Sequence, residues 1–243
     1  MKNVIILLSL IYTFNFFGQE VNGIGEAHYK KSYIASKNTK QESHLSDFEK
    51  YTIKALDRIL FVLKFNRTES LFRMAEQMNL DDGLDLRSAT LIGGGKGVYY
   101  TNIDENVRLH QKVSFEKKYI VESSFKKLQW ELLNKSKNIG GYACYQAKLV
   151  EKIVTSRGVK DRIITAWYAP DLSISFGPIG YGNLPGLIME LVVGKKTVYT
   201  CTRIIFDTSK KISRPKKGLL ISEPAFNIIS KETLEKLKEK EDH

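Results

Sequence analysis

Residues 142–169, YACYQAKLVEKIVTSRGVKDRIITAWYA, and residues 187–206, LIMELVVGKKTVYTCTRIIF, decide the fold. Each stretch contains two runs of apolar and β-branched residues that are separated by a short polar turn. Gly158 marks the first turn, and Gly194 with the two lysines after it marks the second. Paired runs with turns of this kind are typical of β-hairpins. The sequence therefore predicts an antiparallel sheet of consecutive strands.

Further strands and two helical regions are predicted around these hairpins. The strands are expected at 27–34, 59–65, 98–102, 107–115, 118–123, 127–133, 142–153, 162–168, 173–176, 187–193 and 197–206. A capping-box spacing at 46–49 predicts a short helix, and Ser222 before Pro224 predicts the start of a C-terminal helix. The predicted class is mainly β: a single curved antiparallel sheet, or a partly open barrel or bowl, with one or two short helices and a C-terminal helix.

The N-terminus has the pattern of a secretory signal. Lys2 precedes the apolar stretch from Val4 to Phe17, and Gly18 is a small residue at a plausible cleavage point. The stretch is shorter than the about 20 apolar residues that a membrane-spanning helix needs. Residues 1–18 are therefore expected to be a signal peptide and residues 19–243 a single β-rich domain with a charged C-terminal tail. A short buried N-terminal helix is the alternative.

Export would place the mature chain in the periplasm, at the outer-membrane surface or outside the cell. The formal net charge of the chain is +11. In such a compartment we expect anionic envelope components or acidic partners and no nucleic acid, since no aromatic residues interleave with the densest basic run. The densest basic run is Lys210, Lys211, Arg214, Lys216 and Lys217, for which a solvated strand end and loop is the simpler interpretation.

The two cysteines, Cys144 and Cys201, leave two alternatives open. An oxidising compartment permits a disulfide between them. Two buried thiols that pack as small apolar side chains are the favoured interpretation, because the two cysteines lie in strand-like segments separated by two other strands.

One segment carries a family resemblance. Residues 162–191 contain Ala166-Trp167-Tyr168, then Gly177-Pro178, then Leu184-Pro185-Gly186-Leu187-Ile188. This succession resembles the signature of the GLPGLI family, and the segments 139–144, 128–130 and 61–70 fit it as well. The hexapeptide departs from the family pattern at Asn183, where the family has glycine; asparagine is the next most tolerant residue of a positive φ. The resemblance implies an exported protein of Gram-negative bacteria and carries no catalytic residues over to this chain.

The motif has two interpretations in physical terms. Glycines and prolines between two strands can build a loop of fixed shape, which either turns a corner of the sheet or forms a rim that presents a ligand site. The structural residues would be Gly177, Pro178, Leu184, Pro185, Gly186, Leu187 and Ile188. The candidate ligand-binding residues are Trp167, Tyr168, Tyr181, Asn183 and Trp130, although Trp167 also fits a core position.

The sequence contains no zinc-protease, nucleophile-elbow, P-loop or dinucleotide motif. We therefore name no catalytic residue, metal ligand or cofactor. The favoured function is an exported cell-envelope binding or accessory module, which holds a hydrophobic or anionic ligand or a partner protein on a curved sheet. Outer-membrane transport machinery is a candidate partner. A hydrolase acting on peptide or glycan and a purely structural envelope protein are the alternatives.

Overall fold

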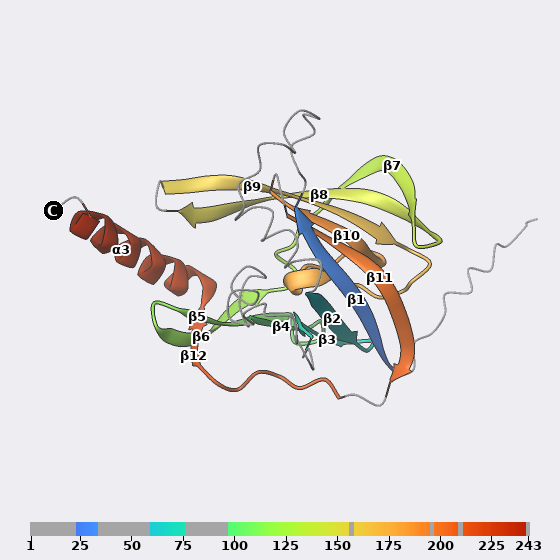
Figure 1. Cartoon of the computed structure of the whole chain (residues 1–243), viewed down its shortest axis with the longest axis horizontal. Coiled ribbons are helices and arrows are strands. Elements are labelled where there is room, and N and C mark those ends of the chain that lie inside the picture. Colours follow the sequence, from blue (N-terminus) through green and yellow to red (C-terminus); the bar gives the residue numbers. More distant parts are fainter. Residues whose placement is uncertain are drawn as a thin grey trace, which may run out of the picture.

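Twelve strands form one sheet in the computed structural model, which describes residues 23–33, 59–75, 97–155, 158–194, 197–208 and 211–241 (Figure 1). The strands are β1 (Ile24–Tyr33), β2 (Leu60–Phe65), β3 (Glu69–Met74), β4 (Val98–Asn102), β5 (Val107–Ser114), β6 (Lys117–Ser124), β7 (Glu131–Ile139), β8 (Tyr142–Thr155), β9 (Gly158–Ala169), β10 (Leu187–Val193), β11 (Thr197–Thr208) and β12 (Leu219–Ser222). The helical elements are the 3₁₀ turn η2 (Pro178–Gly180) and the C-terminal helix α3 (Glu223–Glu241).

The sheet is curved and open, as expected from the sequence. Its order is β12-β6-β5-β4-β3-β2-β1-β11-β10-β9-β8-β7, and the two end strands do not pair, so the sheet does not close into a barrel. Figure 1 shows β7–β10 above and β2–β6 below, with the long strands β1 and β11 running between the two layers. We call these layers the upper half and the lower half. None of the helices in the described ranges is both long and apolar enough to cross a membrane.

The prediction of a purely antiparallel sheet was wrong at one edge. The strand β12 pairs with β6 in parallel, with Leu219 opposite Tyr119 and Ser222 opposite Glu122. The chain leaves β11 in the middle of the sheet and crosses to this edge before it forms β12 beside β6. Because β12 is short and follows a lysine-rich segment, no alternation in the sequence marked it as a strand.

Strand alternation places one face of each half in a shared interior. Opposite pairs on β8 and β9, such as Ala147 with Ala166 and Leu149 with Ile164, turn inward and are buried. Aromatic rings join the layers near the middle of the sheet, where Phe72 stacks on Phe61 with ring centroids 5.5 Å apart and meets Tyr199 at 5.9 Å. We call this buried side the inner face.

Most strand ends differ by a few residues from the prediction, as in β1, which is Ile24–Tyr33 instead of 27–34, and two predicted strands differ more. Residues 173–176 were expected to be a strand, but only Phe176 forms an isolated β-bridge, and its partner is Gly182. Residues 127–133 were also expected to be a strand, but β7 begins at Glu131, because the Leu128 amide donates to the Phe125 carbonyl in a turn. The predicted helix near 46–49 and the signal peptide lie outside the described residues.

Both cysteines carry free thiols in this structure. Cys144 on β8 and Cys201 on β11 are buried. Burial raises the pKa of the Cys144 thiol to about 11 and that of the Cys201 thiol to about 12. The interpretation as two small packed side chains is therefore the one that agrees with the structure.

These thiols should be unreactive in the folded protein. At pH 8 a thiol with a pKa near 11 is ionised in about one molecule in a thousand, and only the thiolate attacks a disulfide reagent. We expect no reaction with Ellman's reagent in the native state and two reacting thiols in denaturant without reductant. A denatured chain that shows no thiols until it is reduced would contradict this assignment.

Candidate functional site

The chain between β9 and β10 folds back into the space between the two halves of the sheet. We call residues 170–186 the interior loop. It closes on itself through hydrogen bonds from the Asn183 amide to the Ser175 carbonyl, 3.0 Å, and from the Ile188 amide to the Phe176 carbonyl, 3.0 Å. Figure 1 shows η2, which belongs to this loop, between the upper and the lower layer. The motif that resembles a family signature therefore builds the centre of the molecule.

Two backbone positions explain the sequence of the loop. Asn183 has a φ of 62° and its side-chain amide donates to the Leu128 carbonyl at 2.8 Å. Asparagine thus tolerates the positive φ of this turn and adds a side-chain hydrogen bond that glycine could not make. Gly186 has a φ of 154°, and a Cβ at this position would overlap the carbonyl oxygen of Ala169.

The apolar side chains of the interior loop cover the inner face of the sheet. Phe176, Tyr181 and Leu184 are buried, together with Ile188 at the start of β10. The hydroxyl group of Tyr29 on β1 donates to the Ile188 carbonyl at 2.8 Å. The concave apolar face considered in the sequence analysis is therefore occupied by the protein's own loop.

The five candidate ligand residues fall into two groups. Trp130, Tyr181 and Asn183 lie together: the Trp130 ring packs edge-on against Tyr181, with centroids 6.2 Å apart, and its indole N–H donates to the Gly182 carbonyl at 2.8 Å. Trp167 and Tyr168 are consecutive on β9 and so point to opposite faces.

Their exposure also differs. Tyr168 and Tyr181 are buried, Trp167 and Trp130 are half-buried, and Asn183 is exposed. The Nζ of Lys137 lies 4.4 Å from the Trp167 ring centroid, so a cation already occupies one side of this ring. A ligand-binding role of the five residues stays a prediction.

Tyr181 also belongs to a hydrogen-bonded network of polar side chains that the sequence analysis missed. Its hydroxyl group donates to Oε1 of Glu151 on β8, and the same oxygen accepts from Nη2 of Arg162 on β9 at 3.0 Å. Burial raises the pKa of Tyr181, and the Glu151 carboxylate raises it further. These three side chains lie on the inner face of the upper half, since Glu151 and Arg162 are directly paired across the strands.

The lower half contributes basic side chains from β5 to the same region. Arg108, His110 and Lys112 alternate along β5 and so share its inner face. The Arg108 guanidinium lies 5.7 Å from the Tyr181 ring centroid, and His110 stacks on Tyr99 with centroids 4.0 Å apart. The interior loop meets them there: a Cβ on Gly180 would lie 3.4 Å from Tyr99 and 3.7 Å from Nε of Arg108.

The closeness of these groups shifts their pKa values. Burial, together with Lys112 and Arg108, lowers the pKa of His110 to about 3, so this imidazole is neutral at pH 7. Burial raises the pKa of Tyr99 to about 12, an effect that Arg162 and Arg108 oppose. Arg108 therefore interacts both with its neighbours on β5 and with groups near β9.

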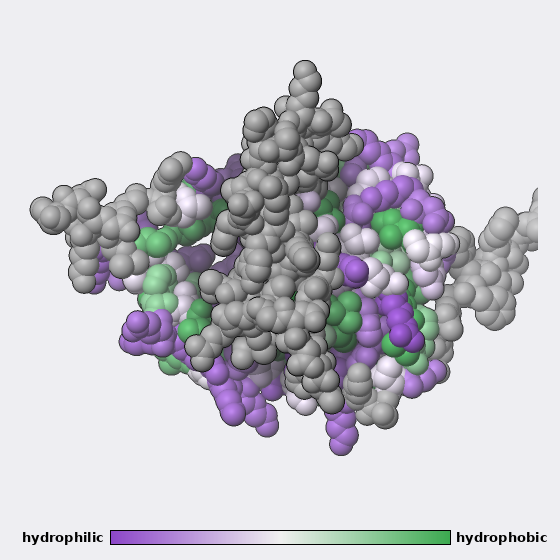
Figure 2. Space-filling model, viewed as in Figure 1, coloured by the Kyte–Doolittle hydropathy of each residue, from purple (hydrophilic) through white to green (hydrophobic). Residues whose placement is uncertain are grey.

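We define the cationic cleft as the group Arg108, His110, Lys112, Glu151, Arg162 and Tyr181. At pH 7 it holds three cations and one carboxylate, and its three cations are half-buried. Within the described ranges, Arg162 pairs with Glu151, but neither Arg108 nor Lys112 forms an ion pair. Lys112 lies toward α3, with its Nζ 3.8 Å from the Phe226 ring centroid. Figure 2 shows a hollow with hydrophilic atoms at its rim between the start of α3 and the sheet.

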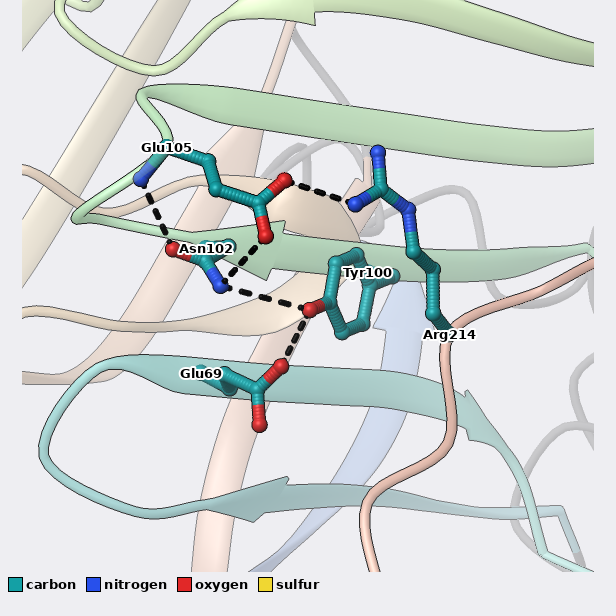
Figure 3. A network of polar contacts seen from close by, with 5 residues as sticks. All are labelled: Glu69, Tyr100, Asn102, Glu105 and Arg214. Atoms are coloured by element: carbon teal, nitrogen blue, oxygen red, sulfur yellow. Dashed lines mark hydrogen bonds and ion pairs between the residues drawn. The ribbon is translucent and has the colours of Figure 1, made fainter.

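A second polar network lies on the outer face of the lower half (Figure 3). Glu69 accepts a hydrogen bond from the Tyr100 hydroxyl group, and Asn102 donates to Glu105 at 3.3 Å. Glu105 also accepts from Arg214 at 2.6 Å. Both carboxylates are thus engaged with neighbouring side chains, and the network attaches the segment around Arg214 to the sheet.

Comparisons with known proteins agree with the fold and leave the activity open. A family model described as a protein of unknown function (Porph_ging) matches residues 154–190. This match overlaps the segment that resembles the GLPGLI signature, while the GLPGLI assignment itself stays a prediction. No curated protein matched the chain.

The solved structures that resemble the chain include two of PNGF-II. The structure of PNGF-II in the P21 space group has a TM-score of 0.52 at 14% identity, over 85% of this chain and 33% of that one. The structure in the C2 space group has a TM-score of 0.49 at 14% identity, over 87% and 32%. The chain thus spans about a third of PNGF-II, and at this identity the likeness shows the fold alone.

The position of the interior loop can be tested at Gly186. We expect Gly186→Ala to lower the free energy of unfolding by about 2–4 kcal/mol, because the new Cβ overlaps backbone and the φ is strained. Gly194→Ala is the matched control: its φ is 63° and nothing lies within 4 Å of a Cβ there, so it should cost about 1 kcal/mol. Urea unfolding followed by tryptophan fluorescence measures both, and equal losses would contradict the packing described.

Proposed function

We propose that this protein is an exported cell-envelope binding module that takes an anionic group into the cationic cleft. The proposal rests on one observation, an excess of positive charge among half-buried side chains. Arg108 and Arg162 both act on Tyr181, and Arg162 pairs with the Glu151 carboxylate. Lys112 follows on the inner face of β5, with Glu223 as its acidic neighbour.

Partial burial of these cations favours the binding of an anionic ligand. Removing a cation from water is unfavourable unless an opposite charge compensates, and the attraction between charges is stronger where water is partly excluded. Guanidinium groups also bind carboxylate and phosphate oxygens in a fixed, often bidentate geometry. An anionic group between β5 and β9 would therefore interact with Arg108 and Lys112, which lack an ion-pair partner among the described residues.

The neighbouring aromatic residues favour a rigid site. His110 is stacked on Tyr99, and Tyr181 is held by Glu151 and by the edge of Trp130. A binding group whose supports are already packed loses little freedom when a ligand arrives. Trp130, Tyr181 and Asn183 act in this proposal as the support of the cleft from the side of the interior loop.

The location of the ligand differs from the first expectation. The interior loop covers the apolar inner face, so we place the ligand at the cleft instead of on an open concave surface. The secretory pattern of residues 1–18 supports export to the periplasm, the outer-membrane surface or the medium, where phosphate- and carboxylate-bearing glycans and lipids are the abundant anions. Outer-membrane transport machinery remains a candidate partner of the same module.

Titration with inorganic pyrophosphate, followed by calorimetry at low ionic strength, tests the cleft. We expect saturable binding to the wild-type protein and binding about 10- to 100-fold weaker in Arg108→Met, because a charge-assisted hydrogen bond to an anion is lost. Met removes the guanidinium group and keeps an unbranched apolar stem, so the packing of β5 should survive.

The control is Lys152→Met, which removes a cation whose side chain is exposed on β8 and is paired with Asp161 at 3.2 Å. It should bind pyrophosphate like the wild-type protein. Absence of saturable binding to the wild-type chain, or equal affinities of Arg108→Met and the wild-type protein, would refute the proposed site.

A further inference from the structure

Exposed apolar side chains gather at the β12 edge of the sheet, away from the cationic cleft. Leu219 and Leu220 are 60% and 61% exposed, and Val113 on β5 is 68% exposed. Neighbouring residues of a strand point to opposite faces, so the two leucines make both sides of this edge apolar. An edge strand with exposed leucines is unfavourable in water unless something covers it.

Lysines surround these apolar side chains. Lys117 and Lys118 at the start of β6 are exposed, and Val113 is directly opposite Lys118. Lys216 and Lys217 are exposed just before β12. The two groups of lysines are adjacent, because a Cβ on Gly218 would lie 3.2 Å from Cγ of Lys118. We define the β12 patch by its residues Val113, Lys117, Lys118, Lys216, Lys217, Leu219 and Leu220.

The segment that carries two of these lysines is held firmly against the sheet. Residues 211–218 cross the outer face of the lower half, where Ile212 packs against a buried cluster that includes Leu109 and Ile120. Arg214 binds Glu105 at 2.6 Å and lies over the Tyr100 ring (Figure 3). The side-chain amide of Gln111 donates to the Lys217 carbonyl at 2.6 Å. The basic run is therefore a positioned part of the surface, and more than a solvated loop.

Among the described residues, no carboxylate forms an ion pair with the lysines of the β12 patch. Glu223 at the start of α3 binds Lys127 at 2.6 Å, and Glu105 binds Arg214. Glu116, in the turn before Lys117, is the acid closest to the lysines in sequence. Figure 2 shows hydrophobic side chains beside hydrophilic ones along this side of the molecule, over β5, β6 and β12.

We propose that the β12 patch docks on an anionic lipid surface. Four lysines would lie at the level of the headgroups, while Leu219, Leu220 and Val113 would enter the boundary of the acyl chains. Apolar side chains ringed by lysines are the combination that binds peripheral proteins to anionic bilayers. This inference is independent of the cationic cleft, and it would orient the module at an envelope membrane.

Co-sedimentation with vesicles tests the proposal on the full mature chain. We compare vesicles of phosphatidylcholine alone with vesicles of phosphatidylcholine mixed with phosphatidylglycerol. The wild-type protein should bind the anionic vesicles, less strongly as salt is added, and the neutral vesicles much more weakly. The variants Lys216→Glu with Lys217→Glu, and Leu219→Gln with Leu220→Gln, should each lower binding at least tenfold.

The matched control is Lys135→Glu with Lys160→Glu, which changes the net charge equally at exposed lysines of β7 and β9. It should bind vesicles nearly as well as the wild-type protein. The proposal is overturned if the wild-type chain ignores anionic vesicles, or if the control loses as much binding as the patch variants. It is overturned as well if the chain is a dimer that the leucine variant dissociates, since β12 would then pair with a second copy.

The same variants separate this proposal from the cleft. Lys216→Glu with Lys217→Glu should leave pyrophosphate affinity unchanged, and Arg108→Met should leave vesicle binding unchanged. Loss of both activities in either variant would contradict the separation of the two sites.

Discussion

Tyr181 occupies the point where the two halves of the sheet meet, and the rest of the arrangement depends on its contacts. Its hydroxyl group binds Glu151 in the upper half, its ring faces Arg108 of the lower half, and it forms a T-shaped pair with Trp130. A buried hydroxyl group needs a partner, and the carboxylate that satisfies it is in turn held by Arg162. The interior loop is therefore fixed by a charged network as well as by apolar packing.

This arrangement has a functional consequence. Because the interior loop covers the inner face of the described part of the sheet, its apolar side is occupied there, and the polar groups that support the loop become the walls of the cationic cleft. The charge of +11 is also distributed unevenly. Part of it is half-buried between β5 and β9, and part is displayed around β12. We assign different partners to these two places, because half-buried guanidinium groups suit a small anionic group and exposed lysines beside leucines suit a surface.

Much of the sheet could be predicted from the sequence, since alternation and turn residues are local signals. The strand at 187–193 was predicted with the bounds that the structure has, and Asn183 was expected to take a positive φ. The parallel strand β12 could not be predicted, because its partner β6 is distant in sequence. The segment 173–176 looked like a strand since its alternating residues are indeed buried, although they pack within a loop.

The cationic cleft could not be predicted from the sequence for a related reason. Arg108 and Lys112 are far from Glu151 and Arg162 along the chain, and only the curvature of the sheet brings them together. The alternation in this strand pointed the other way: Val107, Leu109 and Val113 share the apolar face, so the basic residues at 108, 110 and 112 were expected to face solvent. Only the structure shows that the basic face turns toward the interior loop.

Hydrogen exchange of the interior loop tests the central claim most directly. The claim is that residues 170–186 are a built-in layer between the two halves of the sheet, anchored at Tyr181. The amides of Tyr181, Asn183 and Ile188, which donate to carbonyl groups within the loop, should then exchange as slowly as the amides of the central strands β10 and β11, through global unfolding. Exchange as fast as that of the exposed turn at Glu116 would show a loop that opens independently, and would contradict the account.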